Sequence, residues 1–150
     1  MPRLLVVHHS PSPRVRDIAD AVLRGTRHPG ISGVDVVERA ALEATADDVR
    51  AADGILLGTT ANFGYISGAL KHFFDTTYYQ VREDTAKRPF SYWIHGGYDT
   101  TGAERALTAI TTGYGWTLAA EPVVFTGEVT PEHLDRAAEL GATVAATVMR

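Results

Sequence analysis

Short apolar runs alternate with amphipathic segments along the whole chain, and this alternation restricts the possible folds more than any other sequence feature. The first run, Leu4–Val7, is apolar and rich in branched side chains, as expected for a strand that is covered on both faces. Apolar residues then recur at helical spacing from Val15 to Leu23, and Gly25 follows where a helix would end. The chain is therefore predicted to open with a strand and then a helix.

The same order of a strand followed by a helix is repeated four more times. Strands are predicted at Val34–Val37, Gly54–Gly58, Phe90–Ile94 and Pro122–Phe125. Helices are predicted to start at Thr45-Ala-Asp-Asp48, to cover Ile66 to Phe74, to open as a capping box at Thr101-Gly-Ala-Glu104, and to start at Thr130-Pro131-Glu132. This order predicts an α/β fold, a doubly wound sheet of five parallel strands with helices on both faces.

Length and composition exclude several classes of protein. The 150 residues fit a single domain spanning 1–150, in which the charged segment Arg82–Arg88 is expected to be the least ordered. With 14 basic and 18 acidic residues, the net charge of −4 gives no basic surface for nucleic acid. Disulfides and thiolate chemistry are ruled out because there is no cysteine. We expect a cytoplasmic protein with no membrane segment and, given scattered histidines, no metal site.

In a doubly wound sheet, ligands bind beyond the carboxyl ends of the strands, where the strand order reverses. Three loops of this chain follow such ends: His9–Arg14, Thr59–Ser67 and His95–Thr101. Small and hydroxyl residues with interleaved aromatics suit a phosphate at one end and a flat ring at the other. The first loop leads straight into a helix, whose N-terminus attracts phosphate. Alternatively, Ser12 is only a helix cap and Pro13 only a first-turn proline.

The middle loop carries the most specific pattern. Residues 58–75 resemble the stretch Gly-Thr-Pro-x-x-Phe-Gly-x-x-Ser-Gly-x-x-Lys-x-Phe-x-Asp of flavodoxin-like NAD(P)H:quinone reductases and FMN reductases. The matching residues are Gly58, Thr59, Phe63, Gly64, Ser67, Gly68, Lys71, Phe73 and Asp75. Thr60 stands where that family usually has proline. In weaker form the resemblance covers nearly the whole chain, and includes quinone reductases of the tryptophan-repressor-binding-protein type and short-chain flavodoxins.

This resemblance implies that the cofactor is FMN and suggests which residues hold it. The phosphate would be bound by Ser10, Ser12, Arg14 and Val15. The edge of the ring and the ribityl chain would be bordered by Thr60, Ala61, Asn62, Phe63 and Gly64. The far side would be closed by Gly96, Gly97, Tyr98 and Asp99, with His95 at the mouth of that loop as a proton donor or substrate contact.

Several single residues allow more than one interpretation. Phe63 and Tyr98 lie in glycine-flanked loops, which favours ring stacking over ordinary half-burial. Trp93 and Trp116 are expected to be core residues. Adjacent strand residues point to opposite faces, so at most one of the pair His8-His9 can approach a ligand. A Walker loop, a G-x-G-x-x-G fingerprint after the first strand and a G-x-S-x-G elbow are all missing.

The first loop departs from the flavodoxin pattern Ser/Thr-x-Thr-Gly-x-Thr, because Pro11 and Pro13 have no N–H to donate and Val15 has no hydroxyl. Three functions therefore remain open. The first is an oxidoreductase that passes electrons from NAD(P)H through FMN to a quinone or other small acceptor. The others are a flavodoxin-type electron carrier and a cofactor-free binding module. The resemblance also implies a homodimer or tetramer, with Tyr78-Tyr79 as either an interface or a buried helix end.

Overall fold

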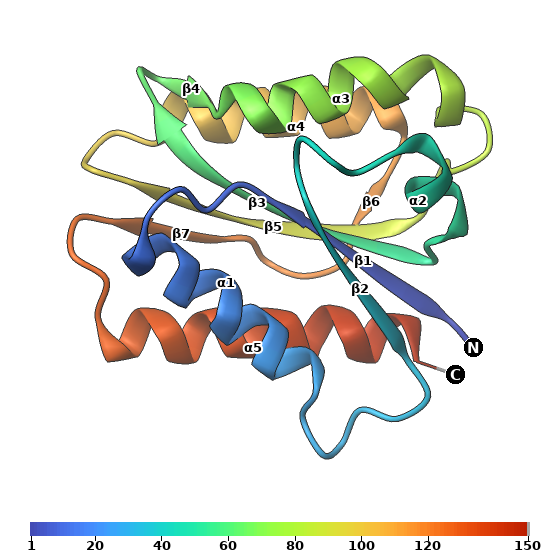
Figure 1. The fold of residues 1–150 in the computed structure, drawn as a ribbon, viewed down its shortest axis with the longest axis horizontal. Coiled ribbons are helices and arrows are strands. Elements are labelled where there is room, and N and C mark those ends of the chain that lie inside the picture. Colours follow the sequence, from blue (N-terminus) through green and yellow to red (C-terminus); the bar gives the residue numbers. More distant parts are fainter. Residues whose placement is uncertain (150) are drawn as a thin grey trace.

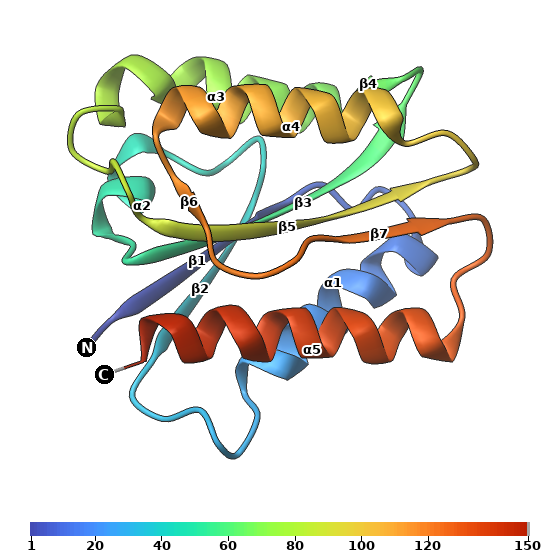
Figure 2. The ribbon, with the colours of Figure 1, turned by 180° about the vertical axis from the view of Figure 1, so that it is seen from behind.

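The protein is a three-layered molecule with a seven-stranded sheet between two layers of helices (Figure 1). The computed structural model describes residues 1–149. Helices α1 and α5 cover one face of the sheet, and α3 and α4 cover the other, with α2 beside them (Figures 1 and 2). The strands are β1 Arg3–His8, β2 Asp35–Ala40, β3 Gly54–Asn62, β4 Tyr65–Ile66, β5 Pro89–Gly96, β6 Thr117–Leu118 and β7 Val123–Thr126. The helices are α1 Pro13–Thr26, α2 Ala46–Ala51, α3 Gly68–Val81, α4 Thr101–Tyr114 and α5 Pro131–Val148.

The predicted doubly wound parallel sheet is confirmed, with two short additional strands. Strands run in the order β2-β1-β3-β5, with β6 and β7 both paired to β5 in parallel. The short strand β4 turns back antiparallel on the end of β3. The chain order reverses between β1 and β3, where His8 is aligned with Gly58. Thr60 of β3 is aligned in turn with His95 of β5, so the three strands end at one edge of the sheet.

Two hydrophobic cores flank the sheet. One lies against α1 and α5 and contains Trp93, which is 1% exposed. The other lies against α2, α3 and α4 and contains Trp116, which is 6% exposed. Both tryptophans are core residues, as predicted. Trp93 also explains Gly58, because a Cβ at that position would lie 2.1 Å from the indole ring.

Gly25 does not end the first helix as the sequence predicted. Helix α1 continues to Thr26, and Gly25 faces α5 at a close crossing. A Cβ on Gly25 would lie 1.8 Å from the carbonyl oxygen of Ala138, and one on Gly141 would lie 2.1 Å from that of Val22. The two helix backbones approach closely because each contributes a glycine, so here the glycine serves packing rather than termination.

Helix α4 starts where expected, but its cap differs from the predicted capping box. The N-cap is Thr100, so Thr101 is the first helical residue. Asp99 Oδ1 accepts the Thr101 N–H at 3.0 Å and takes the role of capping acceptor. Thr100 instead donates its hydroxyl to Glu104 at 3.0 Å. At the last helix, Thr130 and Pro131 occupy their predicted positions, and His133 completes a capping box.

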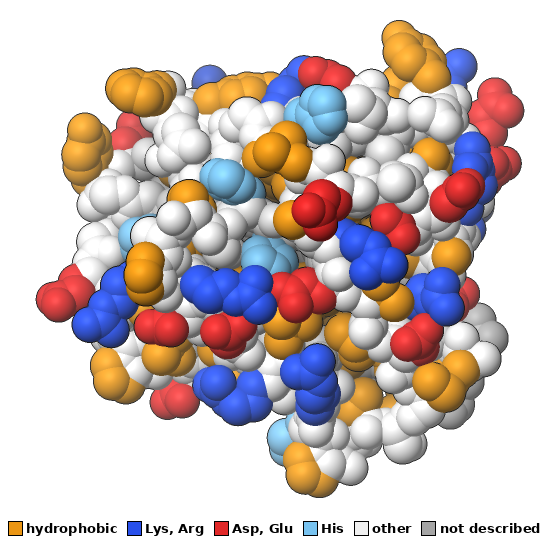
Figure 3. Space-filling model, viewed as in Figure 1, with side chains coloured by type: hydrophobic (Ala, Val, Ile, Leu, Met, Phe, Trp, Pro, Cys, Tyr) orange, Lys and Arg blue, Asp and Glu red, His pale blue; other side chains and the backbone are white. Residues whose placement is uncertain are grey.

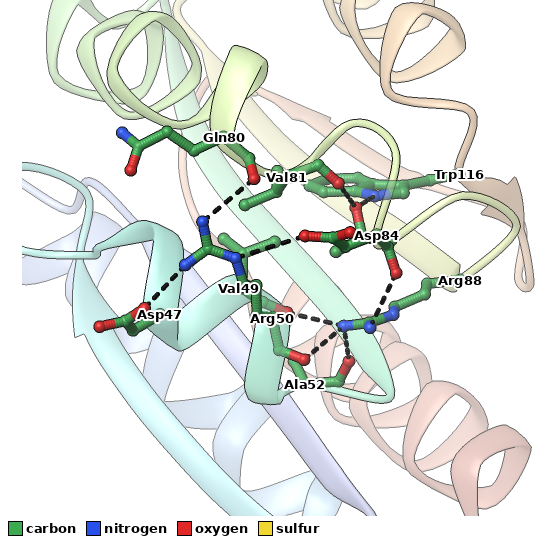
Figure 4. A network of polar contacts seen from close by, with 10 residues as sticks. Asp47, Val49, Arg50, Ala52, Gln80, Val81, Asp84, Arg88 and Trp116 are labelled. Atoms are coloured by element: carbon green, nitrogen blue, oxygen red, sulfur yellow. Dashed lines mark hydrogen bonds and ion pairs between the residues drawn. The ribbon is translucent and has the colours of Figure 1, made fainter.

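The segment between α3 and β5, for which the sequence predicts the least order, makes side-chain contacts with the end of α2. Arg88 donates to the carbonyl oxygens of Val49 and Arg50 at 2.8 Å each, and also to that of Ala52 (Figure 4). These groups end α2, where free carbonyls favour a cation. Burial lowers the pKa of the Arg88 guanidinium. The sequence shows that this segment is charged. It does not show that Arg88 binds the free carbonyl groups at the end of α2.

We predict that Arg88→Ala lowers the free energy of unfolding by about 2–3 kcal/mol, because it leaves several carbonyl groups of α2 without their charged donor. Urea unfolding followed by circular dichroism measures this. Arg14→Ala is the matched control: its guanidinium is 80% exposed and reaches only Asp17 at 3.9 Å. The control is expected to change stability by less than about 0.5 kcal/mol. Equal effects of the two substitutions would contradict the capping role.

Candidate functional site

The three predicted loops meet at the carboxyl edge of the sheet. The His9 N–H donates to the Gly58 carbonyl at 3.0 Å, which joins the first loop to β3. The hairpin of β3 and β4 touches the start of α4, since a Cβ on Gly102 would lie 1.8 Å from the Gly64 oxygen. A Cβ on Gly96 would lie 3.1 Å from that of Ala61. The structure thus brings all three loops into one cluster.

The first loop presents hydroxyl groups at the N-terminus of α1. Ser12 caps the helix and its Oγ accepts the Val15 N–H at a long 3.4 Å. The Val15 side chain is buried in the core, so this residue offers the loop only its backbone. Arg14 extends into solvent, and Ser10 precedes the helix with its hydroxyl against the His8 ring. Ser12 and Pro13 therefore occupy the N-cap and first-turn positions of α1, as the sequence predicted.

The middle loop is a tight hairpin rather than an open loop. Ala61 pairs with Ile66 and Asn62 with Tyr65, so Phe63 and Gly64 form the turn. Both turn residues have positive φ, 49° and 75°. A non-glycine residue rarely adopts that conformation, and such strain concentrates at functional positions.

The base of this hairpin is held by the hydroxyl groups of Thr59 and Ser67. The Ser67 N–H donates to Thr59 Oγ1 at 2.9 Å, and Ser67 Oγ caps α3 by accepting the Leu70 N–H at 3.1 Å. Thr60, one residue further along β3, is only 9% exposed. Its Oγ1 is the buried side-chain polar atom for which residues 1–149 provide no hydrogen-bond partner. Burying such a group without a partner is costly, so its position at the loop cluster points to a ligand.

The third loop is anchored to the strand beside it. His95 Nε2 donates to the Gly127 carbonyl at 2.7 Å, and the Gly127 N–H donates to the Gly96 carbonyl at 2.9 Å. The hydrogen bond from the Thr101 N–H lowers the pKa of the Asp99 carboxyl. Gly97 has open space where a Cβ would be. This loop is therefore fixed at its base and open at its tip.

Aromatic side chains stand free above the cluster. Phe63 is fully exposed, Tyr98 is 89% exposed and Tyr65 is 41% exposed. Figure 3 shows hydrophobic side chains protruding at the corner of the molecule where the β3–β4 hairpin and the β5–α4 loop lie. Large rings that expose this much apolar surface on neighbouring loops favour a flat partner.

Glu38 and Arg16, which lie at this edge beside His8, were not identified by the sequence analysis. His8 Nδ1 lies 2.8 Å from Ser10 Oγ, and His8 Nε2 lies 2.7 Å from Glu38 Oε2. Arg16 of α1 forms an ion pair with Glu38 at 2.9 Å. The sequence shows that His8 ends a strand, but the pairing with Glu38 depends on where β2 lies beside β1, which no motif reveals.

The two adjacent tyrosines of α3 have different environments. Tyr78 is half-buried, with its ring 5.1 Å from that of Tyr114, and Tyr79 is 80% exposed. Both line a cavity of about 320 Å³ between α3 and α4. Tyr78 therefore belongs to the packed end of the helix, which is one of the two predicted roles. Tyr79 does not belong to it.

Comparison with known proteins identifies the family. The profile of the NADPH-dependent FMN reductases matches residues 13–130. The chain belongs to this family. A flavodoxin of Aquifex aeolicus is 33% identical over 75 residues, which is 50% of this chain and 40% of that protein. An NAD(P)H dehydrogenase (quinone) of Acidithiobacillus ferrooxidans is 32% identical over 97 residues, 51% of this chain and 48% of that protein. The alignments thus span less than half the length of each of these two relatives.

A solved structure supports the same fold. The flavodoxin, WrbA-like protein of Agrobacterium tumefaciens superposes with a TM-score of 0.78, over 99% of this chain and 98% of that one, at 19% identity. The expected flavodoxin-like fold is confirmed, and the family and fold together indicate that this chain binds FMN. Within residues 1–149, no helix is long and apolar enough to cross a membrane.

The residues of the loop cluster fit FMN. The unpartnered hydroxyl of Thr60 lies at the carboxyl end of β3, where the ring and ribityl chain would pass. Gly97 leaves open space in the third loop, Gly96 lets that loop approach Ala61, and exposed aromatic side chains stand on both loops. Hydroxyl groups at the start of α1 suit a phosphate. The assignment of individual contacts to FMN remains a prediction.

We predict that Gly102→Ala destabilises the protein by about 1–3 kcal/mol, because the new methyl group would collide with the backbone of the hairpin. Gly68→Ala is the matched control, since this glycine also lies in the first turn of a helix but has no atom within 4 Å of the added Cβ. The control should leave stability unchanged or raise it by up to about 1 kcal/mol. Thermal unfolding compares the two. Equal behaviour would argue against close contact between α4 and the hairpin.

Proposed function

We propose that this chain is an FMN-dependent oxidoreductase that passes electrons from a reduced nicotinamide to a quinone or another small acceptor. One observation supports this most: a hydroxyl-bearing helix start and two exposed aromatic loops share the switch-point edge of the sheet, in a chain of the FMN reductase family. The activities of the relatives belong to longer proteins, so the activity of this chain rests on its own site.

In this proposal the first loop binds the phosphate. Ser10 and Ser12 supply hydroxyl donors, Arg14 supplies an exposed positive charge, and the backbone at Val15 supplies an N–H that now donates to Ser12. Two prolines reduce the number of backbone donors. Side chains therefore carry more of the phosphate binding than in a glycine-rich loop, and charge-assisted hydrogen bonds are strong enough for this.

The hairpin and the third loop enclose the ring. Thr60, Ala61 and Asn62 border one edge, and the Phe63-Gly64 turn covers one side. Gly96, Gly97, Tyr98 and Asp99 close the other side, where the small residues allow close approach. Because Phe63 and Tyr98 stand in solvent, they can move to stack on the ring or to admit a second flat molecule.

When bound, FMN supplies the redox chemistry, accepting a hydride and releasing electrons to an acceptor. The chain positions the ring, keeps one side accessible and excludes water from the other. His95 lies at the mouth of the third loop, with Nε2 committed to the Gly127 carbonyl. Its Nδ1 is therefore the ring nitrogen available to a substrate, and no obligatory acid or base is required of the protein.

A flavodoxin-type electron carrier is the second candidate, favoured by the match to the Aquifex aeolicus flavodoxin. Carriers use strong single-sign surfaces to steer protein partners. Here the net charge is only −4, and basic and acidic side chains are interspersed on the face shown in Figure 3. This distribution favours the enzyme over the carrier.

We predict that the double substitution Ser10→Ala with Ser12→Ala raises the Kd for FMN on the order of a hundredfold, because two hydrogen bonds to a charged group are lost. Riboflavin has no phosphate, so its Kd should not change. Quenching of flavin fluorescence measures both. Thr147→Ala on α5 removes an exposed hydroxyl remote from the cluster and serves as the control. Unchanged FMN binding in the double variant would refute the phosphate assignment.

We predict that the FMN-loaded protein oxidises NADH or NADPH in the presence of a quinone faster than the same concentration of free FMN. Stopped-flow absorbance follows both the nicotinamide and the flavin. The double serine variant with equal total FMN gives the background of unbound cofactor. A bound flavin that dithionite reduces but neither nicotinamide reduces would favour the carrier over the enzyme.

A further inference from the structure

We propose that His8 couples FMN binding to the uptake of a proton, by controlling whether the Ser10 hydroxyl can donate to the phosphate. The inference rests on the proposed function, because it requires the phosphate to lie at Ser10. It concerns a residue to which neither the sequence pattern nor the family resemblance assigns a role. His8 is a positioning residue here, since it acts on the phosphate through Ser10.

The geometry forms a chain of three side chains. His8 ends β1 and is 4% exposed. Its Nδ1 lies 2.8 Å from Ser10 Oγ, in the loop that would bind the phosphate, and its Nε2 lies 2.7 Å from Glu38 Oε2 on β2. The ring of Trp93, centred 5.8 Å away, lies beside the imidazole. The imidazole thus connects a half-buried carboxylate to the loop, while the ring itself is almost completely buried.

The carboxylate decides which nitrogen carries the hydrogen. Hydrogen bonds and ion pairs from His8 and Arg16 outweigh burial and lower the pKa of Glu38, so this group is ionised at neutral pH. A carboxylate only accepts hydrogen bonds, so Nε2 must carry a hydrogen. When the ring is neutral, Nδ1 then has none, and Ser10 must donate its own hydrogen to it. When the ring is protonated, Nδ1 donates to Ser10 and the serine hydrogen is free.

The surroundings of His8 favour the neutral ring when the site is empty. Burial lowers its pKa more than Glu38 raises it. The other charged groups that act on the ring both lie on α1: Arg16 opposes protonation and Asp20 favours it. At pH 7 and above, Ser10 therefore directs its hydrogen towards His8 and presents only lone pairs to the loop.

A phosphate dianion reverses this preference. It needs donors, and Pro11 and Pro13 offer none in this loop. Protonation of His8 releases the Ser10 hydrogen for the phosphate and adds a positive charge behind it. Binding therefore raises the pKa of His8, and a group whose pKa rises on binding takes up protons between its two pKa values. FMN affinity consequently increases as the pH falls through that interval, by up to about tenfold per pH unit.

Calorimetry and NMR of the whole chain test this between pH 7 and 8, where the phosphate of free FMN, with a second pKa of about 6, is already mostly dianionic. Titrations with FMN in buffers of different ionisation enthalpy give the number of protons taken up. We expect net proton uptake with FMN and none with riboflavin. Imidazole NMR signals should show that FMN raises the pKa of His8 and that riboflavin does not.

Variants separate this coupling from the titration of other groups. His8→Gln can still bridge Ser10 and Glu38 but cannot titrate, so proton uptake should vanish and FMN affinity should no longer vary with pH. His9→Gln, the adjacent histidine, is the matched control and should retain the uptake. Glu38→Gln offers His8 an amide donor, which lets a neutral ring keep its hydrogen on Nδ1, so uptake should decrease while binding at pH 8 is maintained or improved.

These experiments separate a failure of the His8 coupling from a failure of the proposed FMN-dependent function. FMN binding with equal proton uptake in the wild type and in His8→Gln would overturn the role of His8 alone, as would an unchanged His8 pKa on binding. No FMN binding at any pH from about 5.5 to 8.5 would overturn both the inference and the proposed function.

Discussion

The parallel pairing of β1 with β3 is the interaction on which the rest of the site depends. It aligns His8 with Gly58, and β5 continues the same edge by aligning His95 with Thr60. Parallel strands end together, so three loops that are far apart in sequence meet at one edge of the sheet. β1, β3 and β5 are each buried on both faces. The two hydrophobic cores, rather than the loops, therefore hold the ends of these strands in place.

Glycine at a few positions lets these elements approach closely enough. Gly58 leaves room for the ring of Trp93, and Gly102 lets α4 begin against the hairpin that β3 forms with β4. The hairpin in turn holds Phe63 at positive φ and directs it into solvent. The close packing of β3, β5 and α4 therefore supports the strained hairpin turn, which in turn exposes its aromatic side chain.

Much of this fold was predictable from local signals. Predominantly apolar runs identified five of the strands, and threonine caps identified the starts of α2 and α5. Local signals failed where a distant partner decides the outcome. Gly25 looks like a helix end but serves the crossing with α5, and β3 extends through polar residues because β5 and β4 pair with them.

The candidate site divides in the same way. Its three loops could be located from strand order and from the gapped pattern around Phe63, because motif residues lie close together in sequence. The contact of His8 with Glu38 joins residues 30 positions apart through the packing of two strands, and only the structure reveals it. For this reason, polar residues that contact a binding loop from a neighbouring strand are difficult to predict from sequence.

Titration of the purified apoprotein with FMN and with riboflavin, followed by visible absorbance, tests the central claim most directly. We predict one FMN bound per chain, with a shifted flavin spectrum, and distinctly weaker binding of riboflavin. Absence of any spectral change up to high micromolar FMN would contradict the account and leave this sheet edge without the cofactor that its loops and family indicate.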